Sequence, residues 1–174
     1  MFFYFFFTTP LHPEVKEEMI KVMDIFGNEN SKHCYGFEAK KKMDEYLAQI
    51  AEILEVSSDQ LAITYSGTDS NRKALWVARK RFGQEAIWCS AVEHSSILDE
   101  VPEDQRFDPR NYAEIPNQAK MLALMGANSE TAAIYPANEL RQKFPDALIL
   151  RDYSQIYPKG ETPDFEHCDF GTFA

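Results

Sequence analysis

Apolar and polar positions follow a helical rhythm in the first third of the chain. Between residues 43 and 54 the apolar residues recur at helical spacing and predict a helix with one apolar face: Met43, Tyr46, Leu47, Ile50, Ala51 and Leu54. A similar spacing from Val15 to Phe26 predicts an earlier helix, opened by Pro13 and closed by Gly27. Both faces indicate packing on a core and carry no chemistry.

After residue 60 the pattern changes to short apolar runs separated by helical stretches. The runs predict strands at Leu61–Thr64, Ala86–Cys89, Met121–Met125 and Ala147–Leu150, with loop between residues 100 and 118. Strands that alternate with helices are typical of an α/β fold in three layers, with helices flanking a mainly parallel sheet. We expect a single domain over residues 1–174, with the first, third and fourth of these runs as central strands.

The chain opens on an aromatic run, residues 1–7, without basic residues before it. The run is far shorter than the roughly 20 residues that a membrane span needs, so we interpret it as a buried strand and expect no membrane association.

Composition and charge narrow the class of protein. A formal net charge of -10 argues against a general nucleic-acid binder, and Lys40, Lys41 and Lys42 lie among acidic residues as the solvated face of a helix would. The cysteines are an odd number, 3, without CxxC spacing. This disfavours a disulfide framework and a zinc site, and we expect a reducing cytoplasm and no metal.

Polar residues follow each predicted strand, where parallel α/β sheets collect their ligands. Ser66-Gly67-Thr68-Asp69-Ser70 is a small-residue turn before a helix, which suits a phosphate but is equally an ordinary cap. His94 is either a surface residue or a catalyst, and Asp152 either caps a turn or binds a ligand. Together with Asn128, these groups indicate a cofactor crevice.

The order of the motifs resembles the cysteine desulfurases of the class V aminotransferase group, over nearly the whole chain. The matching positions are Thr8 to Val15, Phe26-Gly27-Asn28, Ser31 and His33 with Gly36 and Ala39, Thr64 to Asn71, Glu93-His94, Asn128-Ser129-Glu130 and Asp152-Tyr153-Ser154-Gln155. The resemblance implies the N-terminal half of a pyridoxal 5'-phosphate enzyme, with its large-domain fold, cysteine as substrate and a homodimer.

The resemblance also implies roles for single residues. Gly67 and Thr68 would hold the cofactor phosphate, and His94 would stack on the pyridine ring and transfer protons. Asp152 would keep the ring nitrogen protonated, and Gln155 would bind the phenolic oxygen. Asn128 would stand in for a family asparagine near the cofactor, because Ser129 occupies that position.

Several departures from the family lie at or near these positions. The aromatic residues Tyr4 to Phe7 replace polar ones, the phosphate loop is shifted to Tyr65-Ser66-Gly67-Thr68, and the segment between His94 and Asn128 is short. Residues 168–174 resemble the strand that leads to the family's covalent lysine, which this chain lacks. Lys159, between a proline and a glycine, is a poor replacement.

None of Cys34, Cys89 and Cys168 matches the family's nucleophilic cysteine. One hypothesis is therefore a desulfurase part that is inactive alone and completed by a C-terminal half. The others are a decayed, non-catalytic binding or scaffold module and an aminotransferase-like enzyme of the same fold. We expect Thr68, His94, Asp152 and Gln155 to line one crevice.

Overall fold

The computed structural model describes residues 10–157 and 164–174. The predictions about the aromatic run, about Thr8 and Thr9 and about Lys159 lie outside the described residues. Two compact units divide the described chain, one made of residues 10–63 and the other of residues 64–157 with 164–174. The single domain expected from the sequence stays a prediction.

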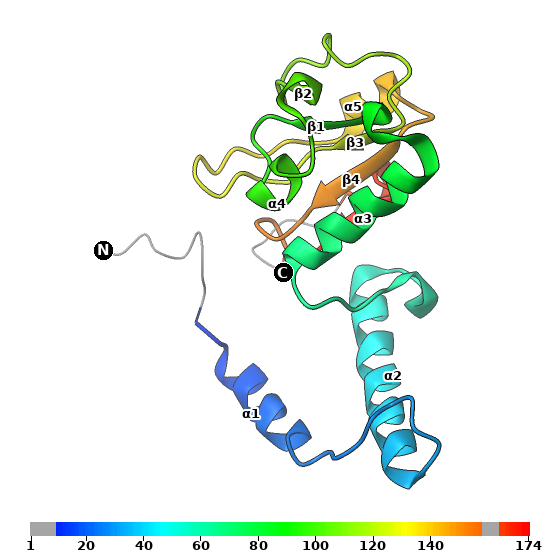
Figure 1. Ribbon diagram of the computed structural model, residues 1–174. Helices are drawn as coiled ribbons and strands as arrows, with labels where there is room; N and C mark the ends of the chain where they lie inside the picture. The colour runs from blue at the N-terminus through cyan, green and yellow to red at the C-terminus, as the bar shows by residue number, and fades with distance from the viewer. Residues whose placement is uncertain (1–9, 158–163) are drawn as a thin grey trace, which may run out of the picture. The chain divides into compact units, whose positions relative to one another are not determined.

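The larger unit is built around a parallel sheet of five strands in the order β2-β1-β3-β4-β5 (Figure 1). The strands are β1 (Ile87–Ser90), β2 (Arg106–Phe107), β3 (Met121–Ala123), β4 (Leu148–Asp152) and β5 (Phe170–Thr172). The α-helices are α3 (Gly67–Phe82), α4 (Ser95–Leu98) and α5 (Asn138–Lys143). The 3-10 turns of this unit are η3 (Gln84–Ala86), η4 (Glu103–Gln105) and η5 (Phe165–His167).

Alternate strand residues build two cores, one on each face of the sheet. On one face Ile87, Met121 and Leu150 pack with the buried residues of α3 and α4. On the other face Leu122 and Ile149 pack with those of α5 and of the loops. The three-layer α/β prediction is thereby confirmed, because the sheet has helices on both faces and an all-parallel register.

Three of the four predicted strands form within a residue or two of their expected ends, as β1, β3 and β4. The strand expected at Leu61–Thr64 is wrong. That segment belongs to no strand, and Ile63 is 62% exposed. A short apolar run alone does not make a strand, because a strand also needs a partner for its backbone groups. The loop expected between residues 100 and 118 is likewise interrupted, by η4 and the edge strand β2.

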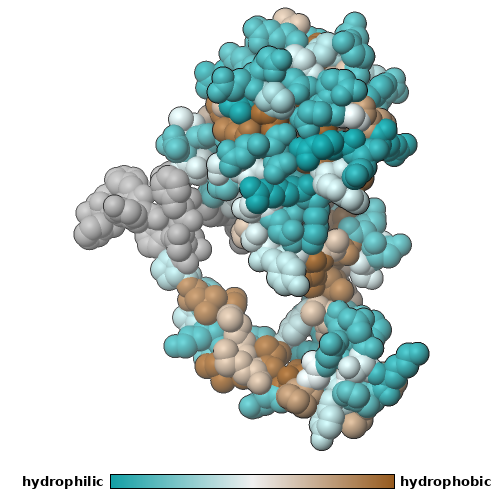
Figure 2. Space-filling view, viewed as in Figure 1, coloured by the Kyte–Doolittle hydropathy of each residue, from teal (hydrophilic) through white to brown (hydrophobic). Residues whose placement is uncertain are grey.

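The smaller unit consists of α1 (Pro13–Val22), α2 (Cys34–Leu54) and the 3-10 turn η2 (Ser58–Gln60). The His33 side chain caps α2 by accepting the Gly36 N–H, and α1 ends at Val22 rather than near Gly27. Of the expected stripe on α2, Ala51 and Leu54 are buried, and α1 buries no residue. Apolar side chains therefore gather on the surface of α1 (Figure 2). Within the described residues, no helix has the length and apolarity to cross a membrane.

Candidate functional site

The sequence-predicted residues lie where strands end and α3 begins. Asp152 is the last residue of β4, His94 follows β1 after three intervening residues and caps α4, and Gly67 opens α3. In a parallel sheet these carboxyl ends face the same edge, so the topology brings their side chains toward one region.

The first turn of α3 lies beside the ends of β4 and β5. Ser66 caps this turn, because its Oγ accepts a hydrogen bond from the Asp69 N–H at 3.1 Å. A Cβ at Gly67 would lie 2.8 Å from the Ala174 Cβ and 3.7 Å from the Ser154 Oγ. A side chain at position 67 would force Ala174 to move, and glycine therefore permits the close approach.

Asp152 is 8% exposed, and its carboxylate accepts hydrogen bonds from two of the described residues. Its Oδ1 accepts the Ser154 N–H at 3.0 Å, and its Oδ2 accepts Asn71 Nδ2 at 2.8 Å. Asn71 itself is 1% exposed and lies on α3. These two donors fix the plane of the carboxylate at the end of β4.

A chain of hydrogen bonds leads from this carboxylate to His94. Asn71 Nδ2 also donates to the Ser96 Oγ at 3.0 Å, and that oxygen lies 2.8 Å from His94 Nδ1. The Ser96 N–H donates to the same Nδ1 at 3.2 Å. Nδ1 is thus an acceptor, and the neutral His94 ring carries its proton on Nε2.

Asn128 stands apart from this network, and no hydrogen bond among the described residues joins it to His94 or Asp152. Its Oδ1 accepts from the N–H groups of Glu130 and Thr131 and from the Thr131 hydroxyl. Its Nδ2 donates to the Val92 carbonyl at 3.2 Å. Gln155 is half-buried, three residues beyond Asp152.

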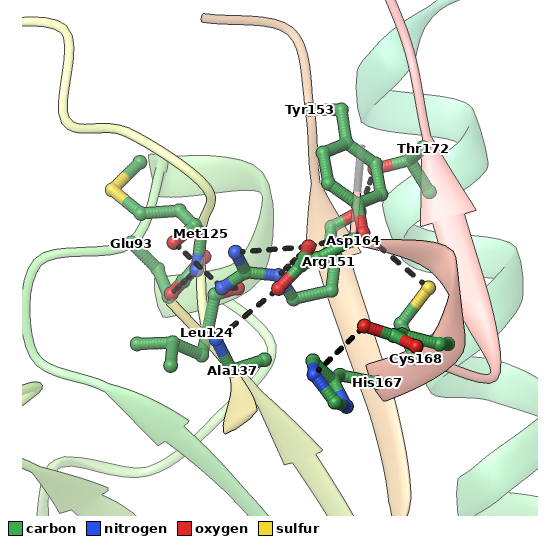
Figure 3. Close-up of polar contacts among 11 residues, drawn as sticks. Glu93, Leu124, Met125, Ala137, Arg151, Tyr153, Asp164, His167, Cys168 and Thr172 are labelled. Carbon is green, nitrogen blue, oxygen red and sulfur yellow. Dashed lines mark hydrogen bonds and ion pairs between the residues drawn. The ribbon is translucent and has the colours of Figure 1, made fainter. Parts of the chain in front are cut away.

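A second polar network lies on the opposite face of β4, where Arg151 points because neighbouring strand residues alternate (Figure 3). Arg151 is 1% exposed, donates to the Leu124 carbonyl at 2.9 Å and pairs with Asp164 at 3.3 Å. Asp164 also accepts the Tyr153 hydroxyl at 2.7 Å. The buried guanidinium therefore has a carboxylate partner and carbonyl acceptors.

Glu93 completes this network from the end of β1. Its Oε1 accepts the Ser90 hydroxyl at 2.5 Å and the Met125 N–H at 2.6 Å. The Leu124–Met125 peptide thus binds Glu93 through its N–H and Arg151 through its carbonyl. Oε2 of Glu93 is buried without a hydrogen-bond partner among the described residues. Burial raises the pKa of Glu93 to about 7, against the hydrogen bonds from Ser90 and Met125, which lower it.

The cysteines lie in different surroundings. Cys34 is exposed, and burial raises the pKa of the Cys89 thiol to about 12. Burial also raises the pKa of Cys168, whose Sγ lies 3.5 Å from the Tyr153 hydroxyl oxygen. A thiol that stays protonated is a poor nucleophile, so Cys89 and Cys168 are packing residues here.

Sequence reasoning missed Asn71, Ser96 and Glu93 as members of these networks. Asn71 carries a detectable signal, because it shares the buried stripe of α3 with Ala74, Leu75 and Ala78. A polar residue on a core-facing stripe needs a partner, and here the partner is Asp152. Arg151 gives no such signal, because a charged residue after an apolar run resembles the start of a loop.

No protein-family model matches the chain. Curated relatives do match: a cysteine desulfurase IscS from Dictyoglomus turgidum is 30% identical over 90% of this chain and 44% of its own length. A NifS/IcsS protein homolog from Lactobacillus delbrueckii subsp. bulgaricus is 29% identical over 86% of this chain and 42% of its own. A solved NifS-like protein from Rickettsia africae superposes with a TM-score of 0.79 at 25% identity, over 96% of this chain and 51% of that one.

The chain spans less than half the length of the curated relatives it matches, and the solved relative agrees with the fold described above. Along about nine-tenths of its residues, the chain is a relative of the IscS and NifS cysteine desulfurases.

Proposed function

We propose that this chain carries the N-terminal part of the cofactor site of a pyridoxal-phosphate-dependent cysteine desulfurase in the cytoplasm. The observation that carries the proposal is the hydrogen-bonded chain from His94 through Ser96 and Asn71 to Asp152, next to the start of α3. The relatives supply the activity, which is release of sulfur from cysteine onto an enzyme thiol.

The donors and acceptors at these positions fit the cofactor. The backbone N–H groups of Gly67 and Thr68 open the α3 helix and bond no described residue, so they suit a phosphate. The Asp152 carboxylate, held by two donors, keeps lone pairs for a protonated ring nitrogen. We assign Gln155 to the phenolic oxygen and His94 to the ring face.

Pyridoxal phosphate supplies an electron sink for the carbanion that forms on the amino acid. The chain's own residues would hold and protonate it. Asp152 would keep a proton at the ring nitrogen, and His94, in its Nε2–H form, would hold a proton close to the substrate. We propose that another segment or chain supplies the covalent lysine and the nucleophilic cysteine.

Asn128 favours a second candidate, the non-catalytic binding module. Its oxygen already accepts three local hydrogen bonds, so it is committed to a turn rather than to a ligand. In that case the fold and a partner surface, such as that of a homodimer, would persist without the chemistry.

Titration with pyridoxine 5'-phosphate separates the two candidates, because this probe has the phosphate and the pyridine but no aldehyde. We expect Asp152→Asn to weaken binding by roughly tenfold, the effect of losing one hydrogen bond to a charged group. The exposed Asp104→Asn is the matched control. Mixing the chain with the C-terminal half of a related desulfurase, in the presence of cysteine and a thiol reductant that releases the enzyme-bound sulfur, should then produce sulfide. A folded chain that binds no probe and gains no activity supports the binding module.

A further inference from the structure

Asn71 forms three side-chain hydrogen bonds that no resemblance assigns. Its Nδ2 donates to Asp152 on β4 and to Ser96 on α4, and its Oδ1 accepts the Thr172 hydroxyl of β5 at 2.6 Å. Asn71 thus joins three elements to α3, from a position that is 1% exposed. Each hydrogen of the amide and its oxygen have a partner, so this buried group is satisfied.

The chemistry of the partners dictates which way the amide faces. A carboxylate only accepts hydrogen bonds, so the atom 2.8 Å from Asp152 must be the nitrogen. The oxygen then faces Thr172, whose hydroxyl can donate to it. Turning the amide over would set its oxygen against the Asp152 carboxylate, so Asp152 fixes the orientation of the amide, and the Thr172 hydroxyl holds the amide oxygen in place.

The second hydrogen of the amide extends the same control to His94. Since the Ser96 hydroxyl oxygen accepts from Asn71, its own hydrogen is directed to His94 Nδ1. That donation reinforces the Nε2–H form of the ring, which the Ser96 backbone N–H also favours.

We propose that Asn71 is the positioning residue of this site, and that its single amide orients the Asp152 carboxylate and, through Ser96, the His94 ring. The expected effect of Asn71 on cofactor binding rests on the proposed function, whereas the hydrogen bonds of Asn71 are present in the chain without a ligand. Because Asn71 lies one turn into α3, it also couples the ring-binding acid to the start of the same helix, where the phosphate would bind. Glu93 lies close enough to Asp152 for the two carboxyl groups to interact electrostatically.

A double-mutant cycle on two probes tests the proposal. Calorimetric titrations with pyridoxine 5'-phosphate and with inorganic phosphate would compare the natural chain, Asn71→Leu, Asp152→Asn and the double variant. We expect Asn71→Leu to weaken the binding of pyridoxine 5'-phosphate by roughly tenfold and the binding of inorganic phosphate by less than about twofold. In the Asp152→Asn background the leucine should add little, because the two residues act as one unit.

Gln105→Leu is the matched control, since it also removes a buried amide and its hydrogen bond in the same unit but touches neither site residue. Equal loss of both probes in Asn71→Leu, or additive losses in the cycle, would overturn the proposal and leave Asn71 a packing residue. If Asn71→Leu does not fold, Thr172→Val carries the same test, because it removes the hydroxyl that holds the amide oxygen of Asn71.

A readout without ligand separates this proposal from the proposed function. The side-chain amide signals of Asn71 in a nitrogen-15 NMR spectrum should shift, relative to the natural chain, in the Asp152→Ala variant. They should stay in place in the Gln105→Leu variant. Shifted signals together with no probe binding would sink the cofactor function and retain the positioning role. Unmoved signals together with normal probe binding would overturn the positioning role and retain the cofactor function.

Discussion

Replacing Glu93 by glutamine should remove a pH dependence from the stability of the sheet unit. The carboxyl is fully enclosed, and burial raises its pKa from 4.5 to about 7. The substituted amide would retain an oxygen for the Ser90 hydroxyl and the Met125 N–H, and it would carry no charge at any pH.

The sign follows from proton binding in the two states. Between about pH 4.5 and pH 7 the folded chain holds a proton on Glu93 that the unfolded chain has lost. Stabilisation from the neutral carboxyl is therefore complete at acidic pH and is lost as the pH rises through about 7. The raised pKa corresponds to about 3 kcal/mol between the two limits.

Urea unfolding followed by tryptophan fluorescence measures this quantity, because Trp76 and Trp88 both lie in the sheet unit. The free energy of unfolding of Glu93→Gln minus that of the natural chain should rise by about 2–3 kcal/mol from about pH 5 to about pH 8. A new unsatisfied amide hydrogen would shift all values by a constant of about 1–3 kcal/mol, so the pH dependence is the diagnostic quantity.

The exposed Glu103→Gln, on the same unit, is the control and should give a flat difference. A flat difference for Glu93→Gln as well would refute the reasoning. It would mean that Arg151 and the two hydrogen bonds hold the carboxylate ionised despite its burial.

Two further predictions concern other buried groups. Asp164→Asn should destabilise the sheet unit by about 3–5 kcal/mol in urea unfolding, because Arg151 stays buried without its carboxylate. Adding Arg151→Met to this variant should recover much of the lost stability. Additive losses in the double variant would contradict the pairing. Iodoacetamide at about pH 8, followed by peptide mass spectrometry, should modify the exposed Cys34 rapidly and the buried Cys89 only after denaturation, and early labelling of Cys89 would count against its burial.

The strands that sequence reasoning found are those whose apolar residues are buried on both faces. β3 and the first three residues of β4 are unbroken apolar runs because helices and loops cover both sides of the sheet. Leu61–Thr64 has the same local pattern but pairs with no strand in the part of the chain that the structure describes, and pairing depends on residues distant in sequence. Local pattern alone could not distinguish these cases.

The sequence singles out positions at strand ends as site candidates, and it does not indicate the residues that support them. The structure joins His94 to Asp152 as parts of one network, and both were found because each follows a strand. The residues that connect them are Asn71 on α3 and Ser96 on α4. Asn71 is separated from Ser96 by 25 positions along the chain and from Asp152 by 81. Such contacts become visible only when the layers are assembled.

The alternation of side chains along β4 links the two polar networks. Asp152 faces α3 while Arg151 faces the other core, so one strand end serves both sides of the sheet. A slip of one residue in register would bury the guanidinium beside Ala74 and Leu75 and would remove it from Asp164, at a cost of several kcal/mol. The Arg151–Asp164 pair therefore fixes the register of β4. Because Asp152 is the next residue, the pair also determines on which face, and at which height, the carboxylate meets Asn71.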